Sequence, residues 1–179
     1  MLELTGRELD RGIDILDVGC GGGWLLAELS IRGIAPGRLH GIDLIPQRVA
    51  AARSRVPRAD ISRADARSLP FEAGRFGLVT MLTALSSMPK DAVEPALHEA
   101  KRVVADSGIV ICYEPRIANP FNRATATISS EVLARTLGPA KASVRLTGFP
   151  PAARRLGRHT DRLYPPLARF APTHRLTAH

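Results

Sequence analysis

The sequence predicts an α/β protein built on a doubly wound, mostly parallel sheet. Strand-like and helix-like patterns alternate along residues 1–115, as they do in sheets that helices cover on both faces. Residues 76–82 are almost continuously apolar, as expected of a central strand buried on both faces. Residues 15–18 run into four glycines within five positions and then into a helical pattern. With 179 residues, the chain suits one domain with a substantial core.

Each predicted element follows from a local signal. The second helix has Pro46 in its first turn, and the last helix opens on Ser129, a residue suited to capping. Residues 149–157 and 163–170 are short helices at best, because prolines interrupt them. In chain order we expect strands at 12–18, 38–43, 59–63, 76–82, 109–113, 141–147 and 174–178, and helices at 24–32, 46–53, 91–104 and 129–137.

The glycine-rich turn is the strongest candidate for a binding site. Glycines allow positive φ angles and a close approach of a ligand to the main chain, and the following helix offers free N–H groups. A dinucleotide-binding turn would need a third glycine where Trp24 stands, and a phosphate-binding loop would need Lys-Ser or Lys-Thr after the glycines. A purely structural turn is the remaining alternative.

The stretch Asp17-Val18-Gly19-Cys20-Gly21-Gly22-Gly23 resembles the first motif of the class I S-adenosylmethionine-dependent methyltransferases. That motif places an acid before G-x-G-x-G at the end of the first strand. Four further segments resemble the same family in the same order: residues 38–43, 65–71, 75–80 and 96–113. The last of these resembles the family's ubiquinone/menaquinone-type (methyltransferase type 11) subgroup.

This resemblance implies a Rossmann-like sheet of strand order 3-2-1-4-5-7-6. Its strand 7 runs antiparallel and would here be short or incomplete, because the chain ends at residue 179. The whole chain, 1–179, is then a single methyltransferase domain. Residues 13–115 would form its cofactor-binding core, and residues 116–179 its basic C-terminal part.

The resemblance also implies which residues bind S-adenosylmethionine. The turn formed by Gly19, Cys20, Gly21 and Gly23 would lie against the methionine part of the cofactor, with the helix N-terminus near its carboxylate. Asp17 would orient the cofactor's ammonium group, directly or through water. A cap on the glycine turn is the structural alternative for Asp17, and both roles can hold.

The next two segments would bind the nucleoside. Asp43 would accept hydrogen bonds from both ribose hydroxyls, as a carboxylate does bidentately. Leu44 would supply an apolar wall for the adenine. Asp65 would hold the adenine amino group, with the backbone of Ala66 nearby. Ordinary turn aspartates are the alternative for both acids.

Two strand ends complete the expected site. Met81 and Leu82 should lie beneath the cofactor, although an apolar strand end is equally consistent with core packing. Glu114 lies at the carboxyl edge of the fifth strand, where open α/β sheets bind ligands. It is therefore the candidate general base, and pairing with Arg116 is the alternative. Cofactor chemistry of this kind needs no shared catalytic residue.

Composition narrows the location and the partners. Cys20 and Cys112 are expected to be free thiols in a reducing compartment, and no Cys/His cluster has zinc spacing, so we expect no metal. The N-terminus has no apolar signal core and no run is long enough for a membrane span, which favours the cytoplasm. Residues 1–115 carry a net charge of −1 and residues 116–179 one of +9.

The expected function is methyl transfer to a small-molecule acceptor. A non-catalytic binding or assembly module is one alternative. RNA methylation guided by the basic segment is another, although the low aromatic content of 4% disfavours nucleic acid as a partner. Few residues precede the first strand, and a homodimer is one way to cover an otherwise exposed cofactor site.

Overall fold

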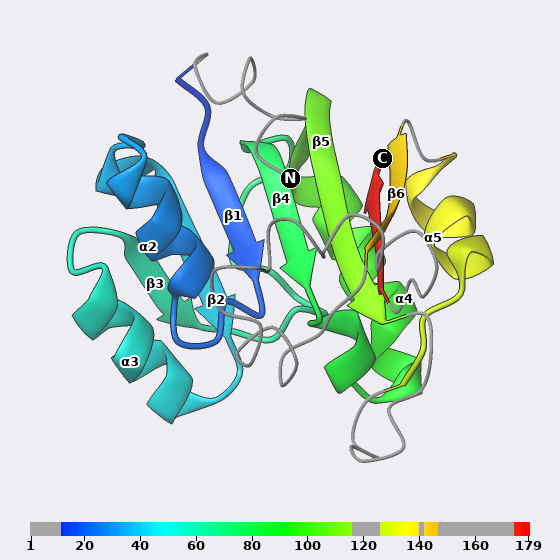
Figure 1. Ribbon diagram of the computed structural model, residues 1–179, viewed down its shortest axis with the longest axis horizontal. Helices are drawn as coiled ribbons and strands as arrows, with labels where there is room; N and C mark the ends of the chain where they lie inside the picture. The colour runs from blue at the N-terminus through cyan, green and yellow to red at the C-terminus, as the bar shows by residue number, and fades with distance from the viewer. Residues whose placement is uncertain (1–11, 116–125, 140–141, 147–173) are drawn as a thin grey trace, which may run out of the picture.

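The computed structural model describes residues 12–115, 126–139, 142–146 and 174–179. They form a seven-stranded sheet in the order β3-β2-β1-β4-β5-β7-β6 (Figure 1). Strands β1 to β5 pair in parallel, and β7 runs antiparallel to both β5 and β6. The strand order and the antiparallel β7 expected from the sequence are therefore confirmed, and β7 is short, with five residues.

The strands and helices occur where the sequence predicted them, with small shifts at their ends. The strands are β1 (Ile15–Val18), β2 (Leu39–Asp43), β3 (Asp60–Arg63), β4 (Phe76–Leu82), β5 (Val104–Pro115), β6 (Ala142–Leu146) and β7 (His174–Ala178). The helices are α2 (Trp24–Ile31), α3 (Pro46–Arg55), α4 (Lys90–Val103) and α5 (Ser130–Leu137), with the short 3-10 turns η2 (Pro36–Arg38) and η3 (Leu85–Ser87).

The largest difference concerns the start of β5. It begins at Val104, directly after α4, whereas the sequence pattern placed its start at residue 109. Val104 pairs with Phe76 and Ile109 with Leu78, so residues 105–108 form an irregularity in the ladder. Their sequence, Ala-Asp-Ser-Gly, carries no apolar strand pattern, and the strand start was therefore missed. The proline-punctuated residues 149–157 and 163–170 lie outside the described residues.

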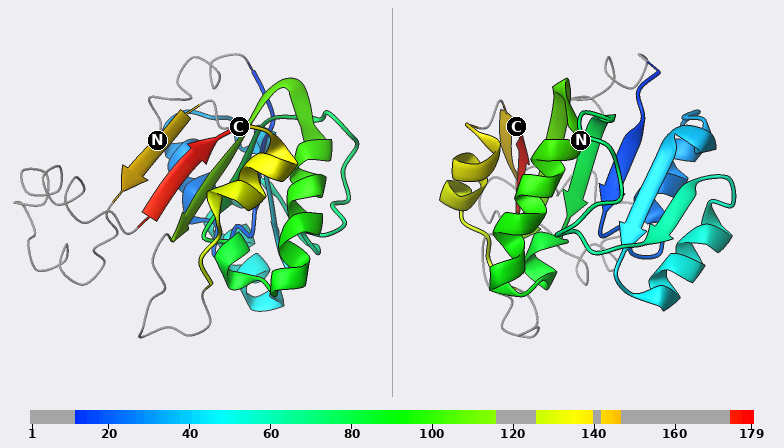
Figure 2. Two further views of the ribbon diagram at one scale, coloured as in Figure 1. Left: turned by 90° about the vertical axis from the view of Figure 1, so that its right-hand side faces the viewer. Right: turned by 180° about the vertical axis from the view of Figure 1, so that it is seen from behind.

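Helices cover both faces of the sheet, as Figure 2 shows from the side and from behind. Side chains of β1 alternate between the two faces: Leu16 joins the core formed with α4 and α5, and Ile15 joins the core formed with α2 and α3. All four residues of β1 are buried. Within the described residues, no helix is both long and apolar enough to cross a bilayer.

The topology brings the functional loops to one edge of the sheet. After β1 the chain moves to β2 on one side and later returns to β4 on the other. Such a reversal leaves a crevice at the carboxyl ends of the strands, which is where open α/β sheets bind ligands. Here the crevice lies between the glycine turn after β1, Asp43 at the end of β2 and Thr83 after β4.

Candidate functional site

The glycine turn is fixed to β2 by its own backbone. The amides of Gly19 and Cys20 both donate to the carbonyl of Ile42, at 2.8 and 2.9 Å. Gly19, Gly21 and Gly23 have φ angles of 74°, 53° and 75°, a region that residues with a Cβ rarely adopt. Three left-handed residues in five positions explain why the sequence places glycine at each of them.

Two of these glycines are also required by close packing. A Cβ at Gly19 would lie 2.8 Å from the Cβ of Ala84, and one at Gly23 would lie 3.0 Å from the Cβ of Ala52. A Cβ at Gly21 would meet nothing within 4 Å. Gly19 and Gly23 therefore hold the turn against its neighbours, whereas Gly21 leaves open space at the site.

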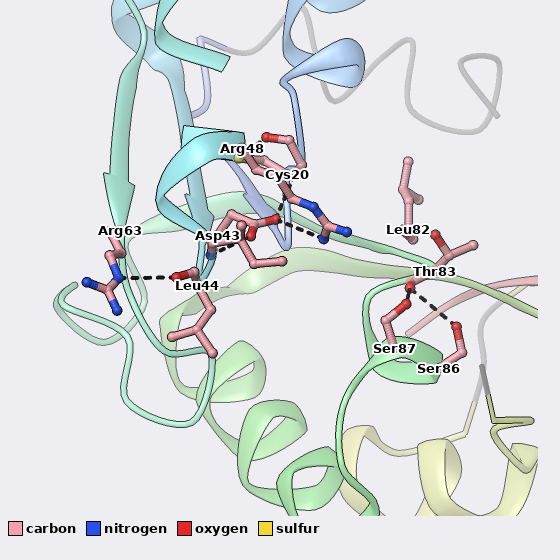
Figure 3. Close-up of polar contacts among 11 residues, drawn as sticks. Cys20, Asp43, Leu44, Arg48, Arg63, Leu82, Thr83, Ser86 and Ser87 are labelled. Carbon is pink, nitrogen blue, oxygen red and sulfur yellow. Dashed lines mark hydrogen bonds and ion pairs between the residues drawn. The ribbon is translucent and has the colours of Figure 1, made fainter. Parts of the chain in front are cut away.

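Asp43 links the ends of β1 and β2. Its Oδ2 accepts the amide of Gly21 and its Oδ1 accepts the amide of Ile45, both at 2.9 Å. The Arg48 guanidinium lies 3.8 Å from Oδ2 (Figure 3). The carboxylate is buried, yet each of its oxygens has a second lone pair with which to accept a further hydrogen bond.

Asp17 lies beneath the turn and is almost completely buried. The hydroxyl of Thr80 donates to its Oδ1 at 2.8 Å. Burial raises the pKa of the Asp17 carboxyl from 3.8 to about 7; the Thr80 hydrogen bond opposes this shift, and the negative charge of Asp43 adds to it. A cation placed beside this carboxyl would favour its ionised form and lower its pKa.

These groups line one cavity of about 650 Å³ at the carboxyl edge of the sheet. The residues of the expected cofactor site that line it are Asp17, Gly19, Cys20, Gly21, Asp43, Leu44, Asp65, Ala66 and Leu82. Asp65 accepts the amide of Arg67 at 2.9 Å and pairs with its guanidinium at 2.7 Å. These hydrogen bonds lower the pKa of the Asp65 carboxyl, so it stays charged.

Three expected residues do not line this cavity. Gly23 packs against Ala52, and Met81 is fully buried in the core under α4, which is the core alternative for that strand end. Glu114 is buried, and its two oxygens accept the amides of Leu85 and Ser86, both at 3.0 Å. Burial raises the pKa of Glu114 to about 7, and these hydrogen bonds oppose the shift. This geometry supports a structural role in holding η3.

The loop after β4 contributes residues that sequence reasoning missed. Thr83, Ala84, Ser87 and Met88 line the cavity, and Thr83 has a φ of 56°, the one positive φ among the described residues that are not glycine. Its carbonyl accepts the hydroxyls of Ser86 and Ser87, at 3.3 and 2.9 Å (Figure 3). No sequence signal marks a threonine in this conformation.

Replacing Thr83 with glycine is expected to stabilise the protein. A β-branched residue at positive φ carries strain of about 1–3 kcal/mol, which exceeds the roughly 0.5–1 kcal/mol that glycine costs through chain entropy. The free energy of unfolding, measured in urea, should rise. As a matched control, Thr127 is exposed and lacks positive φ, so Thr127→Gly should lower stability slightly. A Thr83→Gly variant less stable than the parent would contradict the strain.

Comparisons with known proteins agree with this arrangement. A family model described as a methyltransferase domain matches residues 15–108. An uncharacterized methyltransferase of Synechocystis sp. is 31% identical over 108 residues, which cover 60% of this chain and 50% of that protein. The chain spans about half the length of the curated relatives it matches.

Solved structures extend the likeness to the whole fold. A TehB-like SAM-dependent methyltransferase of Corynebacterium glutamicum superposes with a TM-score of 0.69 at 20% identity, covering 98% of this chain and 84% of that one. SAM-bound CalS10, an amino pentose methyltransferase of Micromonospora echinaspora, is 26% identical with a TM-score of 0.53, covering 67% and 52%. The chain therefore belongs to the methyltransferase-domain family, in its class I, S-adenosylmethionine-dependent branch.

Proposed function

We propose that this chain transfers a methyl group from S-adenosylmethionine to a small-molecule acceptor. The observation that supports this most is the convergence of the glycine turn, Asp17, Asp43 and Asp65 on one cavity. Its volume of about 650 Å³ lies within the range of small-molecule and cofactor sites. Residues far apart in the sequence thus provide, in one place, the groups that this cofactor needs.

The described contacts support a specific assignment of residues to parts of the cofactor. The main chain at Gly19 and Gly21 would lie against its methionine part, and Asp17 would face its ammonium group. Asp43 would accept the two ribose hydroxyls with the lone pairs left free by Gly21 and Ile45.

The adenine end of the cavity follows the same logic. Asp65, oriented by Arg67, would accept a hydrogen bond from the adenine amino group, next to the backbone of Ala66. Leu44 and Leu82 would supply apolar contact. Gly23 and Met81 would act indirectly, by packing beneath these groups.

When bound, the cofactor supplies an electrophilic methyl group on a sulfonium. The chain's own task is to bind, to orient and to exclude water. No base is assigned to Glu114, because it is buried beneath η3 and does not line the cavity. We assign catalysis to positioning rather than to a proton-accepting side chain.

The mouth of the cavity supports the proposal that a second copy of the chain covers it. Trp24 and Leu44 line the same cavity and are 74% and 57% exposed, and exposed apolar side chains that gather in one place mark interaction surfaces.

The two cysteines are buried, and burial raises the pKa of Cys20 to about 12, which fits unreactive thiols in a cytoplasmic protein. Among the described residues, no comparable observation supports the non-catalytic alternative or RNA methylation.

Titration calorimetry with S-adenosylhomocysteine tests the proposed function. We expect saturable binding with a micromolar dissociation constant, followed by methyl transfer in a screen of small acceptors with S-adenosylmethionine. The absence of binding heat at millimolar ligand would overturn the cofactor assignment. Binding without turnover across many acceptors would instead support a non-catalytic module.

The affinity for the same ligand is expected to depend on pH through Asp17. Its pKa of about 7 in the free protein should fall when an ammonium group lies beside it, so binding below pH 7 releases a proton. Affinity should therefore rise as the pH increases from about 6 to 7 and level off above. Calorimetry at pH 6 in two buffers of different ionisation heat measures the released proton, and Asp17→Asn should abolish the release. Equal proton release in both proteins would contradict the role of Asp17.

A further inference from the structure

A second cavity of about 550 Å³ lies beside the first. Its walls are the first turns of α4 and the segment 126–132, which leads into α5. Met88 and Asp91 line both cavities, so the two meet at the N-terminus of α4. Figures 1 and 2 show this end of α4 at the same edge of the sheet as the carboxyl ends of β1 and β4.

The segment 126–132 is fixed at both of its ends. Near the first cavity, the amide of Ala126 donates to the carbonyl of Ser86 in η3 at 2.8 Å. The Ser129 hydroxyl then caps α5 by accepting the amide of Val132 at 3.3 Å, a favoured way to fix a helix start. This cavity is therefore built by defined contacts among the described residues.

Further along α4, two polar contacts fix α5 against it. Arg135 pairs with Glu94, and the Lys101 ammonium donates to the carbonyl of Thr136 at 3.0 Å. Because Glu94 is neutralised by Arg135, it adds little negative charge to the cavity. The remaining charged groups of the lining are Lys90 and Asp91, side by side in the first turn of α4.

The rest of the lining is mostly apolar. It comprises Met88, Val93, Pro95, Ala126, Ile128 and Val132, with Thr127 and Ser129 as neutral polar residues. The second cavity thus combines largely apolar walls with the charged neighbours Lys90 and Asp91, of which only Asp91 also lines the cofactor cavity. A ligand that matches this lining has an apolar body and a single hydrogen-bond-donating group directed toward the first cavity.

We propose that this second cavity binds the apolar body of the methyl acceptor, and that Asp91 accepts the hydrogen bond of its hydroxyl or amine. The acceptor class is thus a small apolar alcohol, phenol or amine. Asp91 contacts the accepting atom directly and orients it toward the cofactor cavity. The methyl group leaves sulfur for this atom, and the proton that the atom loses passes to solvent, to which Asp91 is exposed. This inference rests on the proposed function, since it places the acceptor relative to the cofactor.

A binding experiment with two probes tests the apolar chamber and the carboxylate separately. The probes are 2-naphthol and 2-methoxynaphthalene, which share an apolar body and differ in the donor; binding is followed by probe fluorescence with S-adenosylhomocysteine present. We expect both probes to bind, 2-naphthol more tightly. Val132→Phe should weaken both at least tenfold. Asp91→Asn should weaken 2-naphthol three- to tenfold and leave 2-methoxynaphthalene unchanged.

Controls separate this inference from the proposed function. S-Adenosylhomocysteine affinity, measured by calorimetry, should be the same in Val132→Phe and in the parent, because Val132 lines the second cavity alone. If Val132→Phe does not fold, Ile128→Phe replaces it. No probe binding at millimolar concentration, or unchanged binding in the filled variant, overturns the second cavity while leaving cofactor binding intact. If the unmutated protein does not bind S-adenosylhomocysteine, the proposed function is overturned instead.

Discussion

Replacing Asp43 with alanine is expected to weaken S-adenosylhomocysteine binding by about 10- to 100-fold, which corresponds to roughly 1.4–2.8 kcal/mol. The carboxylate would accept both ribose hydroxyls, and hydrogen bonds to a charged group are the stronger kind. It also accepts the amides of Gly21 and Ile45, so its removal frees the glycine turn as well. Titration calorimetry measures the change directly.

Two further variants make this result interpretable. Asp43→Asn keeps the shape and one acceptor oxygen, so its affinity should lie between those of the parent and Asp43→Ala. Asp106 is exposed near the start of β5, away from the carboxyl edge of the sheet, and Asp106→Ala should bind like the parent. An Asp43→Ala variant with parental affinity would refute the ribose assignment.

The fold was predictable because its signals are local and ordered. Apolar runs located β1, β4 and the second half of β5. Pro46 and Ser129 located two helix starts, and Ser129 proved to be a hydrogen-bonded cap. The glycine turn fixed the register of the family motif, and from that register the position of Asp43 at the end of β2 followed. Most of the expected cofactor residues consequently line one cavity.

What could not be predicted depends on contacts between distant segments. Glu114 was placed correctly at the carboxyl edge, but the amides that occupy it belong to a turn 28 and 29 residues earlier in the chain. The strained φ of Thr83 has no compositional signature. The second cavity exists because residues 126–132 pack against α4, and neither segment carries a recognisable binding motif.

Gly19→Ala is expected to destabilise the protein by about 2–5 kcal/mol. Two costs add. A left-handed conformation costs an alanine about 1–2 kcal/mol, and the native φ is 74°. The new Cβ would also lie 2.8 Å from the Cβ of Ala84, and overpacking of this kind costs about 1–3 kcal/mol. Urea unfolding followed by circular dichroism measures the loss.

Gly21→Ala supplies the matched comparison within the same turn. Its φ of 53° imposes a similar backbone cost, but the added Cβ meets nothing within 4 Å, so the loss of stability should be about 1–2 kcal/mol. That Cβ instead occupies space at the cavity, so Gly21→Ala should lose most of its affinity for S-adenosylhomocysteine while remaining folded. Stability and binding are thereby assigned to different glycines. Equal losses of stability in both variants would show that the contact with Ala84 contributes nothing, and parental affinity in Gly21→Ala would place the cofactor elsewhere.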